Sequence, residues 1–238
     1  MSSNKSILRH VPNTITSLNL FSGCMAVVFA MGGHSLEALG FICLGAFFDF
    51  FDGMSARLLG VQSPVGKELD SLADLITFGM APATILYFYL KHLYLGPVLS
   101  DFSFYIPLLA YLITVFSALR LAIFNLDERQ TEEFIGIPTP ANALFWGALI
   151  VGEGARLQTL SWSPYLLLIL LFLSCYMLNA SIPMLSLKIK KWTVKGNEYR
   201  VVLIVGSLII LGVMHSLSGI AIAICFYILL SLFRNFRR

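Results

Sequence analysis

Charged residues are scarce in this sequence. Only 12% of its 238 residues are Asp, Glu, Lys or Arg, whereas a soluble domain has about a quarter. Hydrophobic residues make up 58% of the chain, and apolar runs long enough to cross a bilayer recur along it. These features exclude an ordinary soluble domain and predict an integral membrane protein, for which we expect no nucleic-acid partner.

Two kinds of motif are also missing. The four cysteines, Cys24, Cys43, Cys175 and Cys225, lie inside apolar runs and form no C-x-x-C pair, so we expect buried free thiols rather than disulfides or a metal site. The N-terminal segment has no small-residue cleavage site after a short apolar run, so we expect no removed signal peptide.

The apolar segments predict membrane-spanning helices, because the strands of a membrane barrel would alternate in polarity. The predicted fold is an all-α, polytopic helical bundle of eight spans; six or seven remain open because the fifth segment and the last two are short or closely joined. The domains are an N-terminal cytoplasmic segment (1–14), a six-helix core (15–186), a basic cytoplasmic loop (187–199) and a C-terminal helical hairpin with a basic tail (200–238). The segments run over residues 15–33, 36–58, 70–92, 103–125, 139–155, 163–186, 200–215 and 217–234.

Basic residues predict the orientation of the spans, because Lys and Arg collect on the cytoplasmic side. With eight spans, thirteen basic residues fall on one side and two, Lys91 and Arg156, on the other. We therefore expect a multi-pass protein of the cell membrane, with both termini and the loop at 57–70 in the cytoplasm. The loop sequence KIKKWTVKGNEYR is interpreted as an anchor on anionic lipid headgroups, with a substrate role as the alternative. The thirteen are Lys5, Arg9, Arg57, Lys67, Arg129, Lys188, Lys190, Lys191, Lys195, Arg200, Arg234, Arg237 and Arg238.

Four of the six aspartates lie within residues 49–74. Asp49 and Asp52 are three residues apart at the end of the second span, and Asp70 and Asp74 are four apart at the start of the third. Each pair therefore shares one helix face. Because the connection between the two spans is short, we expect them to be antiparallel neighbours whose carboxylates meet.

Carboxylates within a span each cost roughly 2.5–3.5 kcal/mol at mid-depth, so something positive must offset four of them. Only Arg57 and Lys67 are nearby, and both lie on the loop side. Divalent cations fit better: ligation by oxygen alone selects Mg²⁺, Mn²⁺ or Ca²⁺ over zinc, and four carboxylates balance two such ions.

Small residues flank the aspartates. Gly53 and Ala56 share their helix face, and Gly66 stands one turn before Asp70. Small residues alone indicate close helix packing, but beside a charged cluster they favour room for a bulky ligand. Two cations beside such a space are typical of phosphoryl-transfer chemistry. The alternatives are the ion path of a cation transporter and a purely structural acidic cluster.

The pattern Asp49-x2-Asp52-Gly53-x2-Ala56-Arg57-x8-Gly66-x3-Asp70-x3-Asp74 resembles the signature of the CDP-alcohol phosphotransferases at all eight fixed positions. The segments PNTITSLNL, GVQSPVGKELDSLADLITFGMAPA and ALRLAIFNLDERQTEEFIGIPTPANA resemble one branch of that family, the membrane-embedded phosphatidylserine synthases. The resemblance covers roughly residues 8–145. It implies transfer of a phosphatidyl group from CDP-diacylglycerol to the hydroxyl of L-serine, with release of CMP.

The resemblance also implies residue roles. Asp49, Asp52, Asp70 and Asp74 would ligate two Mg²⁺ or Mn²⁺ ions, a site that Ca²⁺ can also occupy, and Asp74 would be the general base. The CDP-lipid would contact Pro12, Asn13, Thr16, Gly53, Ala56, Arg57 and Gly66. Family precedent also implies a homodimer among membrane lipids.

The acceptor is predicted from two further positions. Related synthases that use glycerol 3-phosphate or inositol phosphate often have a basic residue directly after the last aspartate, where this chain has Leu75, which favours serine. Arg120, within the fourth span, is expected to bind the serine carboxylate or a lipid phosphate, or to form a structural pair. Asn125 is a weaker candidate for serine contact. A phosphorylated acceptor and an ether-lipid donor remain the alternatives.

Overall fold

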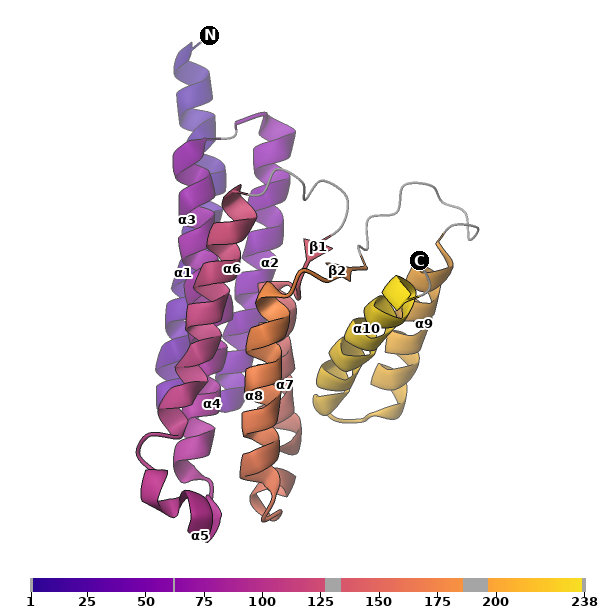
Figure 1. Ribbon diagram of the computed structural model, residues 1–238. Helices are drawn as coiled ribbons and strands as arrows, with labels where there is room; N and C mark the ends of the chain where they lie inside the picture. The colour runs from indigo at the N-terminus through magenta and orange to yellow at the C-terminus, as the bar shows by residue number, and fades with distance from the viewer. Residues whose placement is uncertain (1, 62, 127–133, 186–196, 237–238) are drawn as a thin grey trace.

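The computed structural model describes residues 2–61, 63–126, 134–185 and 197–236. Long helices lie side by side along one axis, and a helical hairpin stands beside them (Figure 1). The elements are α1 (Ser2–Met31), α2 (Ser35–Leu59), α3 (Pro64–Asp74), the π-helix η1 (Leu75–Met80), α4 (Ala81–His92), α5 (Gly96–Leu99), the 3₁₀-helices η2 (Ser100–Phe102) and η3 (Pro107–Tyr111), α6 (Leu112–Leu126), β1 (Phe134–Ile135), α7 (Thr139–Gln158), α8 (Ser163–Asn179), β2 (Pro183–Met184), α9 (Glu198–Val213) and α10 (Ser218–Phe236).

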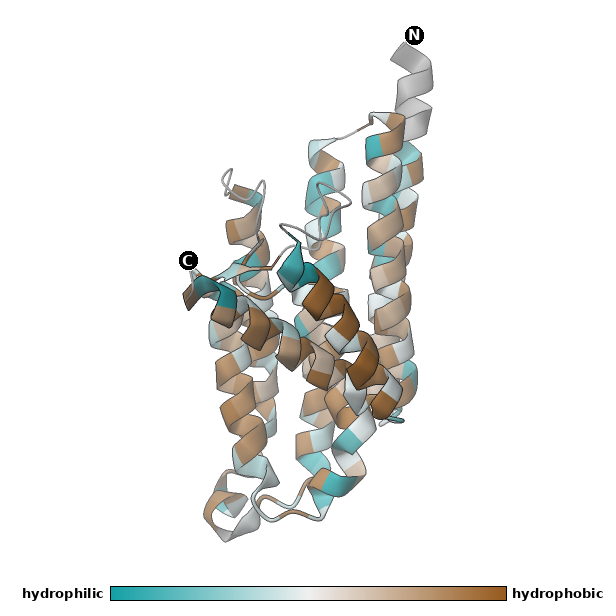
Figure 2. Cartoon of the chain, turned by 90° about the vertical axis from the view of Figure 1, so that its right-hand side faces the viewer, coloured by the Kyte–Doolittle hydropathy of each residue, from teal (hydrophilic) through white to brown (hydrophobic). Residues whose placement is uncertain are grey.

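The predicted all-α class is confirmed. Each expected apolar segment contains a helix: α3, η1 and α4 together form the third, and η3 with α6 the fourth. Apolar residues cover the helices along their length, and hydrophilic ones concentrate toward the helix ends (Figure 2). The chain is therefore a multi-pass membrane protein. Within the described residues, the helical segments long and apolar enough to cross a membrane are His10–Met31, Ser35–Leu59, Pro64–His92, Pro107–Leu126 and Ser218–Phe236.

Three predicted boundaries are wrong. The third span begins at Pro64 instead of near residue 70, so Asp70 and Asp74 lie in the second and third turns of α3. Helix α1 begins at Ser2 instead of near residue 15, so Pro12 lies inside a helix and not before one. Helix α8 ends at Asn179 instead of near residue 186. Pro183 follows shortly and cannot continue a helix; it begins β2, which pairs antiparallel with β1 through Phe134 with Met184 and Ile135 with Pro183.

The connection from α2 to α3 is short and capped at both ends. Gly60 ends α2 in the left-handed conformation (φ 61°) that glycine adopts without a steric penalty. Ser63 is the N-cap of α3: its Oγ accepts a hydrogen bond from the Gly66 N–H at 3.0 Å, and Pro64 occupies the first turn. This geometry turns the chain back, so the ends that carry the aspartates lie near each other.

The third span changes its helical type directly after Asp74. Residues Leu75–Met80 form a π-helix between α3 and α4. Pro82, in the first turn of α4, cannot donate to the carbonyl four residues earlier, so the regular ladder of hydrogen bonds is interrupted here. The wider turn resets the register of the span just beyond Asp74.

Helix α1 is the central packing partner at the site, because it packs along α2, α3 and α4. Helix α7 packs against α2 and α4, α6 against η1 and α8, and α10 against α7. The core includes the fully buried Trp146, whose Nε1 donates to Ser174 Oγ at 3.1 Å and joins α7 to α8. The four cysteines are free, as expected, but the expected burial holds only for Cys175; Cys24, Cys43 and Cys225 are exposed on the helix surfaces.

The orientation predicted from basic residues stays a prediction. The start of α1, the end of α2 and the start of α3 lie at one end of the bundle (Figure 1), as the predicted topology requires. Several of the basic residues that carry the prediction lie outside the described residues, namely Arg129, Lys188, Lys190, Lys191, Lys195, Arg237 and Arg238.

Candidate active site

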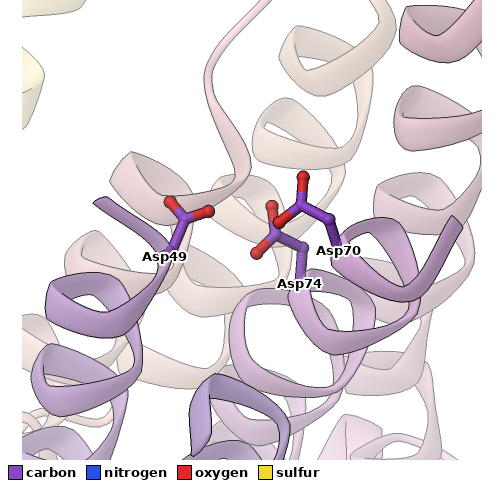
Figure 3. Close-up of side chains that lie close together, drawn as sticks. All are labelled: Asp49, Asp70 and Asp74. Atoms are coloured by element: carbon purple, nitrogen blue, oxygen red, sulfur yellow. The ribbon is translucent and has the colours of Figure 1, made fainter. Parts of the chain in front are cut away.

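Three aspartates from two helices converge on one point. Asp49 on α2 faces Asp70 and Asp74 on α3 (Figure 3), and each of the three offers a carboxylate oxygen within 4.8 Å of the other two. The expected meeting of the two pairs of carboxylates therefore occurs for three of the four residues. Asp70 and Asp74 are four residues apart and therefore share one face of α3. The capped turn at 60–64 reverses the chain direction, so α3 runs antiparallel to α2.

Asp52 lies one turn beyond Asp49 and outside this group of three. It is buried, with 5% of its surface exposed, and it lines a cavity together with Asp70. Asp52 Oδ2 and Asp70 Oδ1 are buried and have no hydrogen-bond partner among the described residues. Neither the ion pair of His34 with Glu37 nor that of Arg156 with Glu153 involves these carboxylates.

These observations test whether a cation fits the site. Several buried carboxylates so close together repel each other, and unpaired buried oxygens carry a desolvation cost. A divalent cation removes both penalties, and an all-carboxylate donor set suits a hard ion such as Mg²⁺, Mn²⁺ or Ca²⁺. The residues therefore fit the cations expected from the sequence.

Asn19 of α1 is a site residue that the sequence analysis missed. It is completely buried, and its Nδ2 donates to Asp74 Oδ1 at 3.1 Å. Its backbone carbonyl accepts a hydrogen bond from Thr77 Oγ1 at 3.0 Å, which ties α1 to the π-helical segment. The available signal was its place in the PNTITSLNL segment, residues 12–20, which resembles the family.

A cavity of about 570 Å³ opens beside the aspartates, between α1, α2 and α3. Six of the seven residues predicted to contact a CDP-lipid line this cavity. Apart from the aspartates, its other lining residues were not predicted to contact a ligand, although Lys67 was noted as a nearby basic residue. The lining residues are Pro12, Asn13, Thr16, Asp52, Gly53, Ala56, Val61, Ser63, Pro64, Gly66, Lys67 and Asp70.

The two glycines of the cavity have different physical roles. A Cβ at Gly53 would meet nothing closer than an Arg57 guanidinium nitrogen at 3.9 Å, so a side chain there would project into open space. A Cβ at Gly66 would lie 3.0 Å from Asn13 Oδ1 and 3.1 Å from Ser63 Oγ. Gly53 therefore keeps the cavity open, whereas Gly66 permits close approach of α1 and the α3 cap.

The two basic side chains near the cavity are both exposed. Arg57, predicted to contact the CDP-lipid, is not among the residues that line the cavity; its Nε donates to the Gly53 carbonyl at 2.8 Å. Lys67 lines the cavity and donates from Nζ to the Asn125 carbonyl at 2.8 Å. The sequence signal for Lys67 was its place directly after Gly66 in the acidic motif.

The two predicted acceptor contacts lie on α6. Asn125 donates from Nδ2 to Ser71 Oγ at 2.8 Å, so its amide joins α6 to α3. Arg120 is buried, with 8% of its surface exposed, and its Nε has no hydrogen-bond partner among the described residues. Its guanidinium carbon lies 6.0 Å from the centre of the Phe124 ring, and its charge interacts electrostatically with Asp74.

The chain is similar to several known transferases. It is 37% identical over 133 residues to the CDP-diacylglycerol–serine O-phosphatidyltransferase of Bacillus subtilis (strain 168), covering 56% of this chain and 71% of that one. The enzymes of the same name from Helicobacter pylori (strain 26695) and Methanocaldococcus jannaschii are 36% identical over 137 residues and 34% over 143. These two matches cover 56% and 60% of this chain, and 54% and 59% of the relatives.

The sequence pattern of the CDP-alcohol phosphatidyltransferases matches residues 9–192, which include the cavity and all four aspartates. That match spans most of the chain. The protein therefore belongs to the CDP-alcohol phosphatidyltransferase family.

Proposed function

We propose that this protein transfers the phosphatidyl group of CDP-diacylglycerol to the hydroxyl of L-serine, giving phosphatidylserine and CMP. The observation that carries the proposal is the convergence of the Asp49, Asp70 and Asp74 carboxylates beside a cavity large enough for a nucleotide. Family membership supports the reaction class over a cation transporter, and the names of the relatives support serine as the acceptor.

Members of the family use divalent metal ions, and the acidic group fits them. Asp49, Asp70 and Asp74 would hold the ions, and Asp52 would complete the set from the cavity side. When bound, two Mg²⁺ or Mn²⁺ ions neutralise the charge of the pyrophosphate and of the departing phosphate.

The cavity between α1, α2 and α3 is the proposed site for the CDP group. Pro12, Asn13 and Thr16 form its α1 wall, where they would border the nucleotide. On the opposite wall, Gly53 and Ala56 leave the backbone of α2 accessible. Arg57 donates a hydrogen bond to the Gly53 carbonyl, at the edge of the cavity where the phosphates of the CDP group would lie.

Asp74 is the proposed general base. It takes the proton of the serine hydroxyl as that oxygen forms a bond to the phosphorus that carries diacylglycerol. The bond from this phosphorus to the bridging oxygen breaks, and CMP leaves with the electron pair. Asn19 holds one oxygen of the base by its hydrogen bond. No covalent enzyme intermediate is needed.

Serine rather than a phosphorylated alcohol is the proposed acceptor. Leu75 follows Asp74, so that position supplies no cation for an acceptor phosphate. Arg120 is close enough to Asp74 for electrostatic interaction and would bind the serine carboxylate. Asn125 is the weaker candidate, because its amide is occupied by Ser71.

The membrane arrangement is also a proposal. The bias of basic residues supports a cytoplasmic active site and cytoplasmic termini in the cell membrane. The homodimer expected from family precedent stays a prediction.

One assay tests the proposed function. Purified protein in lipid nanodiscs is supplied with CDP-diacylglycerol and labelled L-serine, with and without Mn²⁺. We expect labelled phosphatidylserine and CMP in equal amounts, and neither without a divalent ion. Parallel reactions contain glycerol 3-phosphate, inositol phosphate or an ether-linked CDP-lipid. Release of CMP only with another alcohol would refute serine, and turnover only with the ether lipid would refute the donor.

A further inference from the structure

Two buried polar atoms on the packed helices α6 and α8 lack hydrogen-bond partners among the described residues. Arg120 of α6 has a buried Nε without a hydrogen-bond partner among the described residues, and Asn179 at the end of α8 has a buried Oδ1 in the same condition. A buried donor or acceptor left unpaired costs about 1–3 kcal/mol. Two such groups, one donor and one acceptor, therefore indicate a ligand that pairs with both.

The orientation of the Asn179 amide is fixed by its other hydrogen bond. Its Nδ2 donates to the backbone carbonyl of Phe116 at 2.9 Å. A carbonyl only accepts hydrogen bonds, so the NH₂ group must face α6 and Oδ1 must be the atom left free. Phe116 and Arg120 are four residues apart, one turn along the same face of α6. The free acceptor of Asn179 thus lies on α8 beside the stretch of α6 that carries Arg120.

The C-terminal hairpin reaches the same region. Tyr227 of α10 packs against a buried cluster that contains Ile137, Met177 and Met184, and Met177 stands two residues before Asn179. The Tyr227 hydroxyl and the Arg120 guanidinium are close enough to interact electrostatically. Hydrogen bonds from Asn235 Nδ2 to the Pro183 carbonyl, 2.8 Å, and from the Leu185 N–H to Ser231 Oγ, 3.2 Å, fasten α10 to the segment after α8.

We propose that Arg120 and Asn179 bind the acceptor as a zwitterion: the guanidinium pairs with the carboxylate of serine, and Asn179 Oδ1 accepts a hydrogen bond from its ammonium group, with Tyr227 of α10 lining the same site. This inference rests on the proposed function and deepens it. It gives the C-terminal helix a part in acceptor binding, although α10 lies outside the matched family segment at 9–192.

The chemistry explains why such a site discriminates between acceptors. Glycerol 3-phosphate has no ammonium group, so it would leave Asn179 Oδ1 unpaired. Ethanolamine has no carboxylate, so it would leave the Arg120 charge buried without a partner. A site built to pair with both groups rejects an analogue that lacks one of them, because the protein's own polar group then loses its partner.

The experiment compares L-serine with 3-hydroxypropionate, which lacks the ammonium group, and with ethanolamine, which lacks the carboxylate. For the wild type, we expect kcat/KM to be at least tenfold higher for serine than for either analogue. We expect Asn179→Leu to raise the KM for serine about tenfold, leave the KM for CDP-diacylglycerol within twofold, and abolish the preference over 3-hydroxypropionate.

Controls separate acceptor binding from helix packing. Ser174 lies on α8 with Asn179, and Ser174→Ala removes the hydrogen bond that Ser174 accepts from Trp146 of α7. This variant should leave the ratio of kcat/KM between serine and 3-hydroxypropionate unchanged. An Asn179→Leu variant that slows both acceptors equally would overturn the inference. Equal kcat/KM of the wild type for 3-hydroxypropionate and serine would also overturn the inference, and this comparison needs no variant. If the wild type makes no phosphatidylserine at all, the proposed function itself fails.

Discussion

Asn19 on α1 and Asp74 on α3 are joined by a buried hydrogen bond of 3.1 Å from Nδ2 to Oδ1, across 55 residues of sequence. The bond fixes one oxygen of the proposed base and leaves the other carboxylate oxygen for a cation or a proton. Gly45 makes this contact possible, because a Cβ there would lie 2.9 Å from Asn19 Oδ1 and would overlap Thr77. The proposed base is thus held where three helical segments pack closely.

The first prediction concerns this hydrogen bond. Asn19→Ala should lower kcat by about 10- to 100-fold, because a hydrogen bond to a charged group contributes about 1.5–3 kcal/mol and each 1.36 kcal/mol is tenfold in rate. The KM for CDP-diacylglycerol should change less than twofold. Tyr89→Phe, which removes the interhelical bond to the Gly154 carbonyl, is the control. Equal kcat in the two variants would mean that Asn19 has no positioning role.

The second prediction separates the base from nucleotide binding. Asp74→Asn should abolish turnover because an amide cannot accept the proton of the hydroxyl, yet CDP binding should persist because Asp74 is not among the residues that line the cavity. Turnover is followed by release of labelled CMP, and CDP binding by calorimetry. Parallel loss of turnover and CDP binding would contradict the role of a base.

The third prediction concerns the cations. Asp49→Asn and Asp52→Asn should each weaken Mn²⁺ binding by about tenfold or more, because affinity depends on the number of charged oxygen ligands. The titration is followed by electron paramagnetic resonance of the free ion. Asp101→Asn, at an exposed acid in η2, should leave the titration unchanged. An Asp52→Asn titration that overlays the wild type would exclude Asp52 as a ligand.

Spacing alone predicted the acidic site, because residues three and four apart share a helix face and a short connection forces two spans to turn back. The structure agrees for Asp49, Asp70 and Asp74. Spacing could not predict how deeply each aspartate side chain is buried, or that α1 packs against the two helices that carry the aspartates. That helix packs against both α2 and α3, so a cavity with walls from three helices lies where two neighbouring spans were expected to meet.

Other features depend on contacts that no local pattern encodes. Asn19 lies in the PNTITSLNL segment, but the segment does not indicate its role, because its partner lies 55 residues away. The π-helix at Leu75–Met80 has the same apolar composition as a regular helix; Pro82 indicates an interruption there but not its π-helical form. Arg57 matched the family motif, but motif membership does not determine its rotamer, and its Nε is bonded to the Gly53 carbonyl outside the cavity lining.

The fourth prediction tests the cavity without disturbing the fold. Gly53 faces open space, with no atom closer than 3.9 Å to an added Cβ, so Gly53→Val should fold normally while its side chain occupies the volume proposed for the CDP group. We expect CDP affinity, measured by calorimetry, to fall by at least about tenfold, because even one extra methylene in a binding pocket changes the binding free energy by about 1–3 kcal/mol.

The matched control is Gly40→Val on the same helix, because Gly40 is exposed and an added Cβ there also meets nothing within 4 Å. The two substitutions carry the same cost in helix propensity, since each replaces glycine by valine in α2. Only Gly53→Val should therefore lose CDP affinity, while both variants should unfold at similar temperatures. If both bind CDP like the wild type, the nucleotide does not occupy the cavity between α1, α2 and α3, and the carboxylates must serve a ligand that approaches from another side.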